Sequence, residues 1–234
     1  MDKYFNPDKQ HTLQQEVSIS GTGLHTGINV DMTLKPANPG FGFQFQRIDL
    51  PGMPVIKADC DLVTDTSRGT TLEYNGAKVS TVEHILAALV GMGVDNCLIE
   101  LNGPEIPIID GSSAPFVDLI EEAGVVEQDA AKIWYTLDTN VSFFDEVKRV
   151  EITALPATSY QITTLIDFNS PVLGTQHAGL KSMMDFKEEI APCRTFCFLH
   201  ELEMLIDNNL IKGGDINNAI VIVDKPVTED EMSR

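Results

Sequence analysis

The segment from Ser80 to His84 holds the residue types with the clearest capacity for chemistry. It reads Ser-Thr-Val-Glu-His, and apolar and small residues follow it to residue 91. A carboxylate beside an imidazole can move a proton, and an imidazole is also a common metal ligand. Glu83 and His84 are therefore the first candidates for a catalytic pair.

A structural interpretation competes with this chemistry. Ser80 and Glu83 have the spacing of a capping box, in which the glutamate accepts a hydrogen bond from the first residue of a helix. That interpretation explains Glu83 but not His84, which would lie about 200° around the helix from Val82, among small residues. A packed imidazole needs partners for its nitrogens. The pattern alone favours a hydrogen-bonded core histidine and leaves a metal ligand as the alternative.

Three other polar positions have both structural and chemical interpretations. The run GTGLHTG at 21–27 has the glycine density of an anion-binding loop. An alternating strand follows it, whereas a dinucleotide loop opens a helix, so a tight turn around His25 is favoured. Asp110 and Gly111 are typical of a turn and helix cap. Thr195 is either a strand or cap residue, or a residue whose hydroxyl donates a hydrogen bond to a developing oxyanion.

The first half of the chain contains clear elements to position these residues. Alternating residues predict strands over 28–34 and 42–46, joined as a hairpin or meander, and another strand over 96–101. A helix is predicted over 80–91, with a buried stripe and no polar side beyond its first turn, so we expect it to be covered on both sides. The stripe consists of Val82, Ile85, Leu86, Leu89 and Val90. A second helix is expected between a cap at Ser112 or Ser113 and an end at Gly124.

A polar run over 127–132 precedes a second series of elements. Strands are expected around 133–144, 147–154 and 160–167, followed by a helix at about 182–190, a helix ending before Gly213 and a short buried strand over 219–223. We place a domain boundary near residue 127. The predicted domains are an N-terminal α+β domain (1–127) that carries the Thr-Val-Glu-His motif and a C-terminal α+β domain (128–234).

The composition excludes several classes of protein. Among 234 residues, 35 acidic and 16 basic side chains give a net charge of −19, which argues against a nucleic-acid partner. No apolar run approaches the length of a membrane span, so we expect no transmembrane segment and a cytoplasmic location. The four cysteines form no C-x-x-C pair, which predicts buried free thiols.

The motifs together resemble one enzyme family. GTGLHTG, VSTVEHILAAL, DNCLIELNGPEIPIIDGSSAPF, RTFCF and GGDINNAIVI occur in the order and approximate spacing of the UDP-3-O-acyl-N-acetylglucosamine deacetylases, between about residue 10 and residue 224. These are zinc amidohydrolases of lipid A, and hence lipopolysaccharide, biosynthesis. The resemblance implies two α+β domains, each a β-sheet with helices, with the helices sandwiched between the two sheets. It agrees with a helix over 80–91 that is covered on both sides.

The resemblance also assigns roles to residues. It implies that His84 binds Zn²⁺ and that Glu83 is the general base for water attack on the substrate's acetamide, which gives a free amine and acetate. It implies that Thr195 stabilises the oxyanion, and that Phe196 and Phe198 lie near the substrate or its acyl chain. The expected substrate is UDP-3-O-acyl-N-acetylglucosamine.

One departure from the family sets a further expectation. Family members continue to a His-Lys-x-x-x-Asp motif, which supplies two more zinc ligands, and to a histidine that acts as general acid; neither follows Asp224. We therefore expect a C-terminally truncated chain that is inactive as given, with an apolar patch exposed on its second sheet. The alternatives are a non-catalytic fragment that binds acyl-sugar nucleotides, and the front part of a deacetylase fused to a 3-hydroxyacyl-carrier-protein dehydratase.

Overall fold

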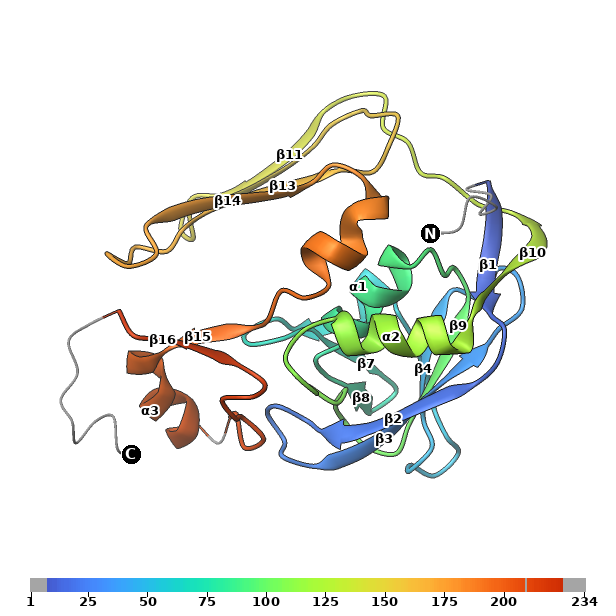
Figure 1. Cartoon of the computed structure of the whole chain (residues 1–234), viewed down its shortest axis with the longest axis horizontal. Coiled ribbons are helices and arrows are strands. Elements are labelled where there is room, and N and C mark those ends of the chain that lie inside the picture. Colours follow the sequence, from blue (N-terminus) through green and yellow to red (C-terminus); the bar gives the residue numbers. More distant parts are fainter. Residues whose placement is uncertain (1–7, 209, 225–234) are drawn as a thin grey trace.

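The computed structural model describes residues 8–208 and 210–224, and it confirms a mixed α+β fold. Its α-helices in the described ranges are α1 (Glu83–Gly91), α2 (Ala114–Ala123) and α3 (Leu199–Asp207). Helices α1 and α2 lie between a five-stranded sheet and two hairpins from the second half of the chain (Figure 1). Glu83 and His84, at the start of α1, are half-buried.

The five-stranded sheet forms the first half of the core. Its order is β2 (Val17–Thr22), β3 (Asn29–Pro36), β9 (Cys97–Leu101), β4 (Phe43–Arg47) and β5 (Val55–Lys57), with β4 and β9 parallel. The predicted alternation in β3 is confirmed, because Val30, Met32 and Leu34 are fully buried, although Ile28 lies before the strand and is 47% exposed. The predicted hairpin of β3 and β4 is wrong, because β9 lies between these two strands and pairs with both of them.

Helices α1 and α2 pack against each other through their apolar faces. In α1 the buried residues are Ile85, Ala88, Leu89 and Gly91, whereas the predicted core residue Val90 is 48% exposed. In α2 the buried stripe is the predicted one and includes Phe116, Leu119 and Ile120. The Ser112 hydroxyl accepts a hydrogen bond from the Ala114 N–H (3.1 Å), and Gly124 ends the helix with a φ of 72°.

Two smaller sheets complete the first half, and one of them changes the interpretation of the polar run. The strands β6 (Val63–Asp65), β7 (Thr71–Tyr74) and β8 (Ala77–Val79) form a small sheet after a 3₁₀ turn at Cys60–Leu62. β1 (Lys9–Leu13) pairs with β10 (Val125–Ala131), so the run over 127–132 is largely a strand. The proposed boundary at 127 falls inside β10, and the division into two domains stays a prediction.

The second half, as far as it is described, contains two hairpins, one parallel pair of strands, short helical turns and α3. β11 (Val141–Asp145) pairs with β12 (Val150–Ala154), β13 (Ile162–Asp167) with β14 (Thr175–Leu180), and β15 (Phe196–Phe198) with β16 (Ile220–Ile222). The expected helix over 182–190 is a 3₁₀ turn, η2 (Met183–Asp185), followed by a π-helical turn, η3 (Phe186–Ile190). β11 begins later than residue 133, and β16 is partly exposed, not buried.

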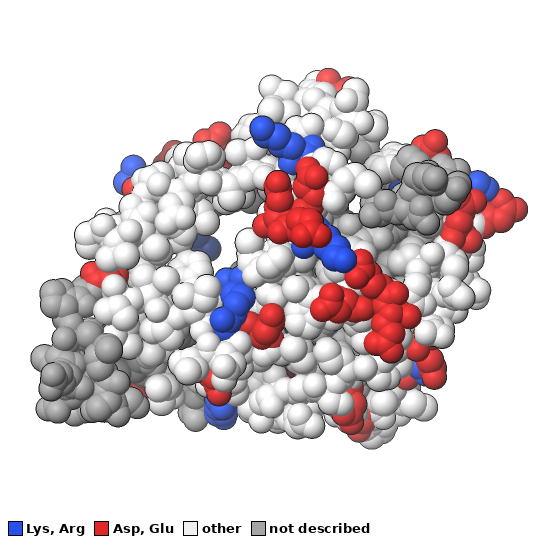
Figure 2. Space-filling view, in the orientation of Figure 1, with Lys and Arg blue, Asp and Glu red and all other residues white. Residues whose placement is uncertain are grey.

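The surface of the second half is rich in apolar side chains. Phe143 and Ile152 on the β11–β12 hairpin and Leu165 on β13 are each more than 60% exposed, which agrees with the expected apolar patch. Acidic side chains gather over the middle of the face in Figure 2, and Glu121 on α2 pairs with Lys187 on η3 at 2.6 Å. Within the described ranges, no helix has the length and apolar character required to cross a membrane.

The cysteines differ from their expected burial. Cys97 in β9 is buried, and this burial raises the pKa of its thiol to about 12. Cys60 and Cys193 are exposed and Cys197 is half-buried, so the prediction of buried thiols is wrong for three of the four. All four are free, as expected. Cys60 begins the 3₁₀ turn, Cys193 lies in the loop before β15, and Cys197 lies in β15 of the two-stranded β15–β16 sheet.

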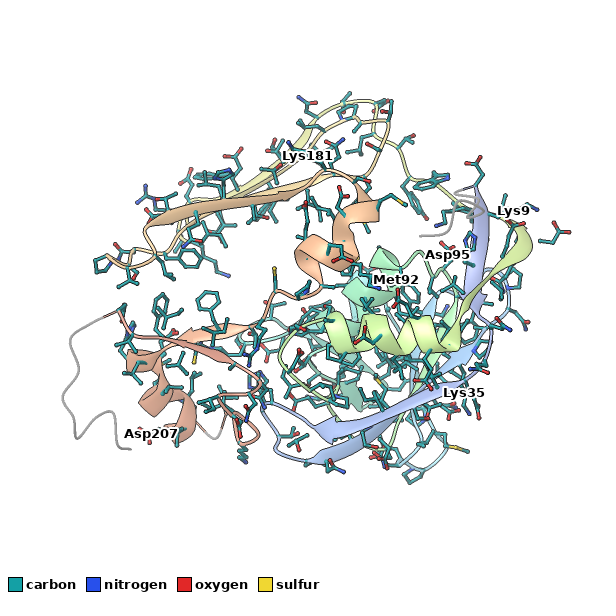
Figure 3. The ribbon with its side chains drawn as sticks, in the orientation of Figure 1. Lys9, Lys35, Met92, Asp95, Lys181 and Asp207 are labelled. Atoms are coloured by element: carbon teal, nitrogen blue, oxygen red, sulfur yellow. The ribbon has the colours of Figure 1, made fainter. Side chains whose placement is uncertain are left out.

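A buried histidine lies where β1 meets the loop before β9. The Asp95 carboxylate accepts a hydrogen bond from the His11 N–H (2.8 Å) and lies 3.6 Å from His11 Nδ1, while Lys132 Nζ contacts it at 3.0 Å. Asp95 lies beside β1 (Figure 3). Burial lowers the pKa of His11, and the opposing charge of Asp95 is the smaller effect. The charge of Lys132 also lowers the pKa of His11, whereas the charge of Glu127 raises it.

We expect the protein to lose stability as the pH falls below about 6.5. Because the pKa of His11 is lowered on folding, the unfolded chain binds a proton more readily, and stability is lost from the unfolded value of about 6.5 down toward the folded one. Urea unfolding at pH 7.5 and 5.5 measures the difference in the free energy of unfolding between the two pH values. His11→Gln should make this difference smaller, whereas His177→Gln, on the exposed face of β14, should leave it unchanged. An unchanged difference in the His11 variant would contradict this account.

Candidate functional site

Glu83 begins α1, and its carboxylate is held by the loop that precedes β7. Glu83 Oε2 accepts a hydrogen bond from the backbone N–H of Thr70 at 3.0 Å. The predicted capping box is therefore wrong, because the helix begins at Glu83 and not near Ser80. Ser80 instead forms strand-like bonds, donating its N–H to the Pro104 carbonyl (2.9 Å). The glutamate is free of a capping role and fixed in direction.

His84 is the next residue, and its environment favours a neutral imidazole. Burial lowers the pKa of His84, although the charges of Glu83 and Asp110 oppose the shift. The backbone is also fixed, because the Ser113 hydroxyl donates to the His84 carbonyl (3.0 Å) and joins α1 to the start of α2. A neutral imidazole is the form that binds a metal or accepts a proton.

Thr195 is brought to the same site by the turn that precedes α2. The Thr195 N–H donates to the Gly111 carbonyl at 2.8 Å, and Arg194 Nε donates to the Asp110 carbonyl at 2.7 Å. Asp110 Oδ1 in turn accepts from the N–H and the hydroxyl of Ser112. The predicted turn at Asp110 is confirmed, and it also sets an acidic group close enough to His84 to influence its pKa.

Phe196 and Phe198 follow on β15 and belong to a row of four rings. The ring centroids of Phe168 and Phe196 are 5.6 Å apart, those of Phe196 and Phe198 are 6.0 Å apart, and Phe198 stacks on His200 at 5.3 Å. Phe196 is exposed and Phe198 is half-buried. Phe196, the second ring of this row, directly follows Thr195, so the row brings aromatic side chains next to the threonine.

The loop over 66–70 contacts both α3 and the turn around His25. Arg68 forms an ion pair with Glu201 on α3 (3.3 Å), and its carbonyl contacts His25 Nε2 at 3.2 Å. Glu201 also accepts from the Phe198 N–H at 3.2 Å. The tight turn expected around His25 is confirmed, because β2 and β3 pair up to Thr22 and Asn29. The turn is packed against the site and is not an isolated surface loop.

The structure offers one clear position for a metal ligand near Glu83. His84 has the required neutral imidazole, but no group of three potential ligands forms around it within residues 8–208 and 210–224. In these ranges such a group occurs only at Asp59, Cys60 and Asp61, which are exposed. There Asp59 already accepts from the Asp61 N–H in a 3₁₀ turn. His84 therefore fits one zinc position, and the described residues do not complete a three-ligand set.

Residues 10–234 match the sequence model of the LpxC family, described as UDP-3-O-acyl N-acetylglycosamine deacetylase. The chain belongs to this family. The match covers the segments that carry Glu83, His84 and Thr195, and it confirms the family resemblance seen in the sequence motifs.

Curated relatives that resemble this chain include proteins with two different names. Bifunctional enzymes named LpxC/FabZ from Chlorobaculum tepidum and Bacteroides thetaiotaomicron are 47% and 46% identical, over 95% and 97% of this chain and 48% and 49% of the relatives. A UDP-3-O-acyl-N-acetylglucosamine deacetylase from Myxococcus xanthus is 46% identical, over 91% of this chain and 68% of that relative. The chain thus spans about half the length of the bifunctional relatives.

Two contributors to this LpxC-family site were not identified from the sequence. Thr70 supplies the backbone N–H that holds Glu83. Its role cannot be recognised from the sequence, because every residue except proline offers the same N–H group. Glu105 is fully buried beside the site and accepts hydrogen bonds from Thr81 and from the loop around His25. A lone glutamate among the apolar residues of the EIPII segment was its only signal.

Gly111 is the residue whose replacement should disrupt the Thr195 side of the site. Its φ is +83°, and an added Cβ would lie 2.0 Å from the Asn218 carbonyl oxygen. We expect Gly111→Ala to lower the free energy of unfolding by about 1–2 kcal/mol for the left-handed backbone and by a further ~1–3 kcal/mol for the contact. Chemical denaturation measures the sum of these two losses.

Gly76 offers a matched control for this prediction. It has nearly the same φ, +80°, in the turn between β7 and β8, but nothing lies within 4 Å of an added Cβ. Gly76→Ala should therefore show only the backbone cost. Equal losses in the two variants would mean that the close approach of Asn218 to Gly111 has no energetic weight.

Proposed function

We propose that the protein is a zinc-dependent deacetylase that hydrolyses the acetamide of UDP-3-O-acyl-N-acetylglucosamine in lipid A biosynthesis. One observation carries the proposal. Glu83 and His84 stand side by side at the start of α1, with Thr195 held against the turn at Asp110, whose charge acts on His84. Named relatives that act on this substrate class support it.

Glu83 serves as the general base in this proposal. The Thr70 N–H fixes Glu83 Oε2, while Oε1 faces Gly69, where an added Cβ would lie only 3.3 Å away. A carboxylate held on one oxygen keeps its direction when the other takes a proton from water. The loop thus orients the base, and Gly69 leaves room beside it.

His84 serves as a zinc ligand in the same proposal. Its lowered pKa keeps the imidazole neutral at pH 7, and the Ser113 bond to its carbonyl fixes the start of the helix. When bound, zinc lowers the pKa of water toward ~7 and polarises a carbonyl. Phe196 and Phe198 would then contact the acyl part of the substrate.

Thr195 is assigned to the oxyanion that forms during attack. We expect Thr195→Val to reduce kcat by about 10²-fold with little change in KM, because the hydroxyl would bind the charge that develops only in the transition state. Thr195→Ser keeps the hydroxyl and should retain most of the turnover. Steady-state kinetics on the full-length protein decides between them. An unchanged kcat in the valine variant would remove Thr195 from the mechanism.

A non-catalytic protein that binds acyl-sugar nucleotides is the alternative. Mass spectrometry of UDP-3-O-acyl-N-acetylglucosamine incubated with the zinc-loaded full-length protein separates the two functions. Formation of the free amine supports the deacetylase. Binding at micromolar concentration without any change in the ligand supports the alternative and contradicts catalysis.

A second enzyme fused downstream is a further candidate. The bifunctional LpxC/FabZ relatives support it, because this chain matches about half of their length at 46–47% identity. We propose a 3-hydroxyacyl-carrier-protein dehydratase as that partner domain. A cytoplasmic location remains a prediction from the sequence. Assay of the full-length protein for dehydration of a 3-hydroxyacyl thioester tests the fused activity.

A further inference from the structure

Glu105 is a buried carboxylate for which the proposed chemistry has no use. Its side chain lies between β9 and α2 in the chain and is 0% exposed. Among the described residues it forms no ion pair, so its hydrogen bonds alone compensate for its burial. Burial of a carboxylate costs free energy unless hydrogen bonds satisfy its oxygens. The donors of those bonds are often held in place by the carboxylate.

The partners of Glu105 come from two separate segments. Glu105 Oε1 accepts from the Thr81 hydroxyl (2.9 Å) and the His25 N–H (3.0 Å). Oε2 accepts from the Thr26 N–H (2.8 Å) and also contacts the His25 N–H (3.2 Å). The carboxylate therefore joins the turn between β2 and β3 to the residue that precedes α1 by two positions.

The backbone around Glu105 makes the same connection. The Ser80 N–H donates to the Pro104 carbonyl and the Ile106 N–H donates to the Ser80 carbonyl, while the Ile108 N–H donates to the Thr22 carbonyl. The segment over 104–108 thus lies between the other two. An added Cβ on Gly23 would lie 2.5 Å from Glu105 Oε2, so the turn rests directly on the carboxylate.

Thr81 has a backbone conformation that needs this support. Its φ is +60°, in the left-handed region, which is unfavourable for a β-branched residue. Thr81 is buried, and its hydroxyl bond to Glu105 is the side-chain contact that holds it. Glu83 follows two residues later, so the direction in which its carboxylate points depends on the backbone at Thr81.

We propose that Glu105 is a positioning residue for the catalytic pair. It holds Thr81 in the left-handed conformation, and this fixes Glu83 against the Thr70 N–H and sets His84 at the start of α1. It holds the turn at His25 and Thr26 through separate bonds. The expected effect on turnover rests on the proposed deacetylase function, whereas the effect on the backbone does not.

The Thr70 amide provides a direct readout, because its hydrogen exchange reports the bond to Glu83 Oε2. In Thr81→Val, which removes only the hydroxyl, we expect the Thr70 amide to exchange at least ~10-fold faster, while the His25 and Thr26 amides remain protected. In Glu105→Gln, which has one acceptor oxygen, the His25 amide should also exchange faster. Thr81→Ser should restore the wild-type pattern.

Kinetics of the full-length protein provides the second readout. Thr81→Val should lower kcat by about 10-fold with KM within twofold, because the base is displaced but the binding surface is not. Thr33→Val, which removes a hydroxyl bonded to Ser18 (2.8 Å) on the exposed side of β3, is the matched control and should change neither readout.

The two readouts separate failure of this proposal from failure of the proposed function. Unchanged Thr70 exchange in Thr81→Val overturns the positioning role, whatever the activity. Faster Thr70 exchange with an unchanged kcat in an active protein overturns it as well. If the wild-type protein releases no acetate, the deacetylase proposal fails, and the exchange experiment still decides whether Glu105 positions Glu83.

Discussion

Replacing Glu83 with glutamine should lower kcat of the full-length protein by about 10²–10⁴-fold, the range expected for loss of a general base. The amide oxygen of glutamine can still accept from the Thr70 N–H, so the 3.0 Å contact and the fold should persist. KM should change little because the substituted group acts on water and not on the substrate's binding groups. Steady-state acetate release measures the effect.

Glu122→Gln is the matched control for this prediction. Glu122 is an exposed glutamate near the end of α2, and the same change of one charge there should leave kcat unaltered. Thermal unfolding of both variants should match the wild type within a few degrees. A Glu83→Gln protein with normal turnover would show that another group takes the proton from water.

Replacing His84 with glutamine should remove the metal and, with it, more than ~10³-fold of the activity. The imidazole at the start of α1 is the zinc ligand that we propose beside Glu83, and a structural loss is not expected because Ser113 bonds to the His84 backbone. Elemental analysis of the full-length protein should show near-stoichiometric zinc in the wild type and under about a tenth of it in the variant.

His177→Gln is the control for the metal prediction. His177 lies on the exposed β14 strand, opposite Leu165 of β13, and its loss should change neither zinc content nor turnover. Retention of zinc and activity in His84→Gln would contradict its role as a ligand. Loss of zinc in both variants would point to an unspecific effect on folding.

Local periodicity was sufficient for many elements but not for their pairing. The buried alternation of Val30, Met32 and Leu34 and the stripe of α2 follow from the spacing of apolar residues. The wrong hairpin arose because β9, about 60 residues further along the chain, inserts between β3 and β4. The period of a strand shows which face is buried, but it does not show which strand lies next to it.

The candidate site was predicted where residue types are distinctive and missed where they are not. Glu83, His84 and Thr195 stood out by type and by family resemblance, and the structure places all three around the starts of α1 and α2. The capping box failed because Ser80 bonds to the distant segment around Glu105. Glu105 itself was missed because its partners lie 24 and 80 residues away in the sequence.

Zinc-dependent acetate release from UDP-3-O-acyl-N-acetylglucosamine tests the central claim most directly. The full-length protein should release one acetate for each free amine formed, lose this activity when a chelator removes the metal, and regain it when zinc is restored. The Glu83→Gln protein, loaded with zinc, should keep its kcat about 10²–10⁴-fold below that of the wild type. Hydrolysis of the acyl ester in place of the acetamide, or an intact acetamide after prolonged incubation with the zinc-loaded wild type, would contradict the assignment.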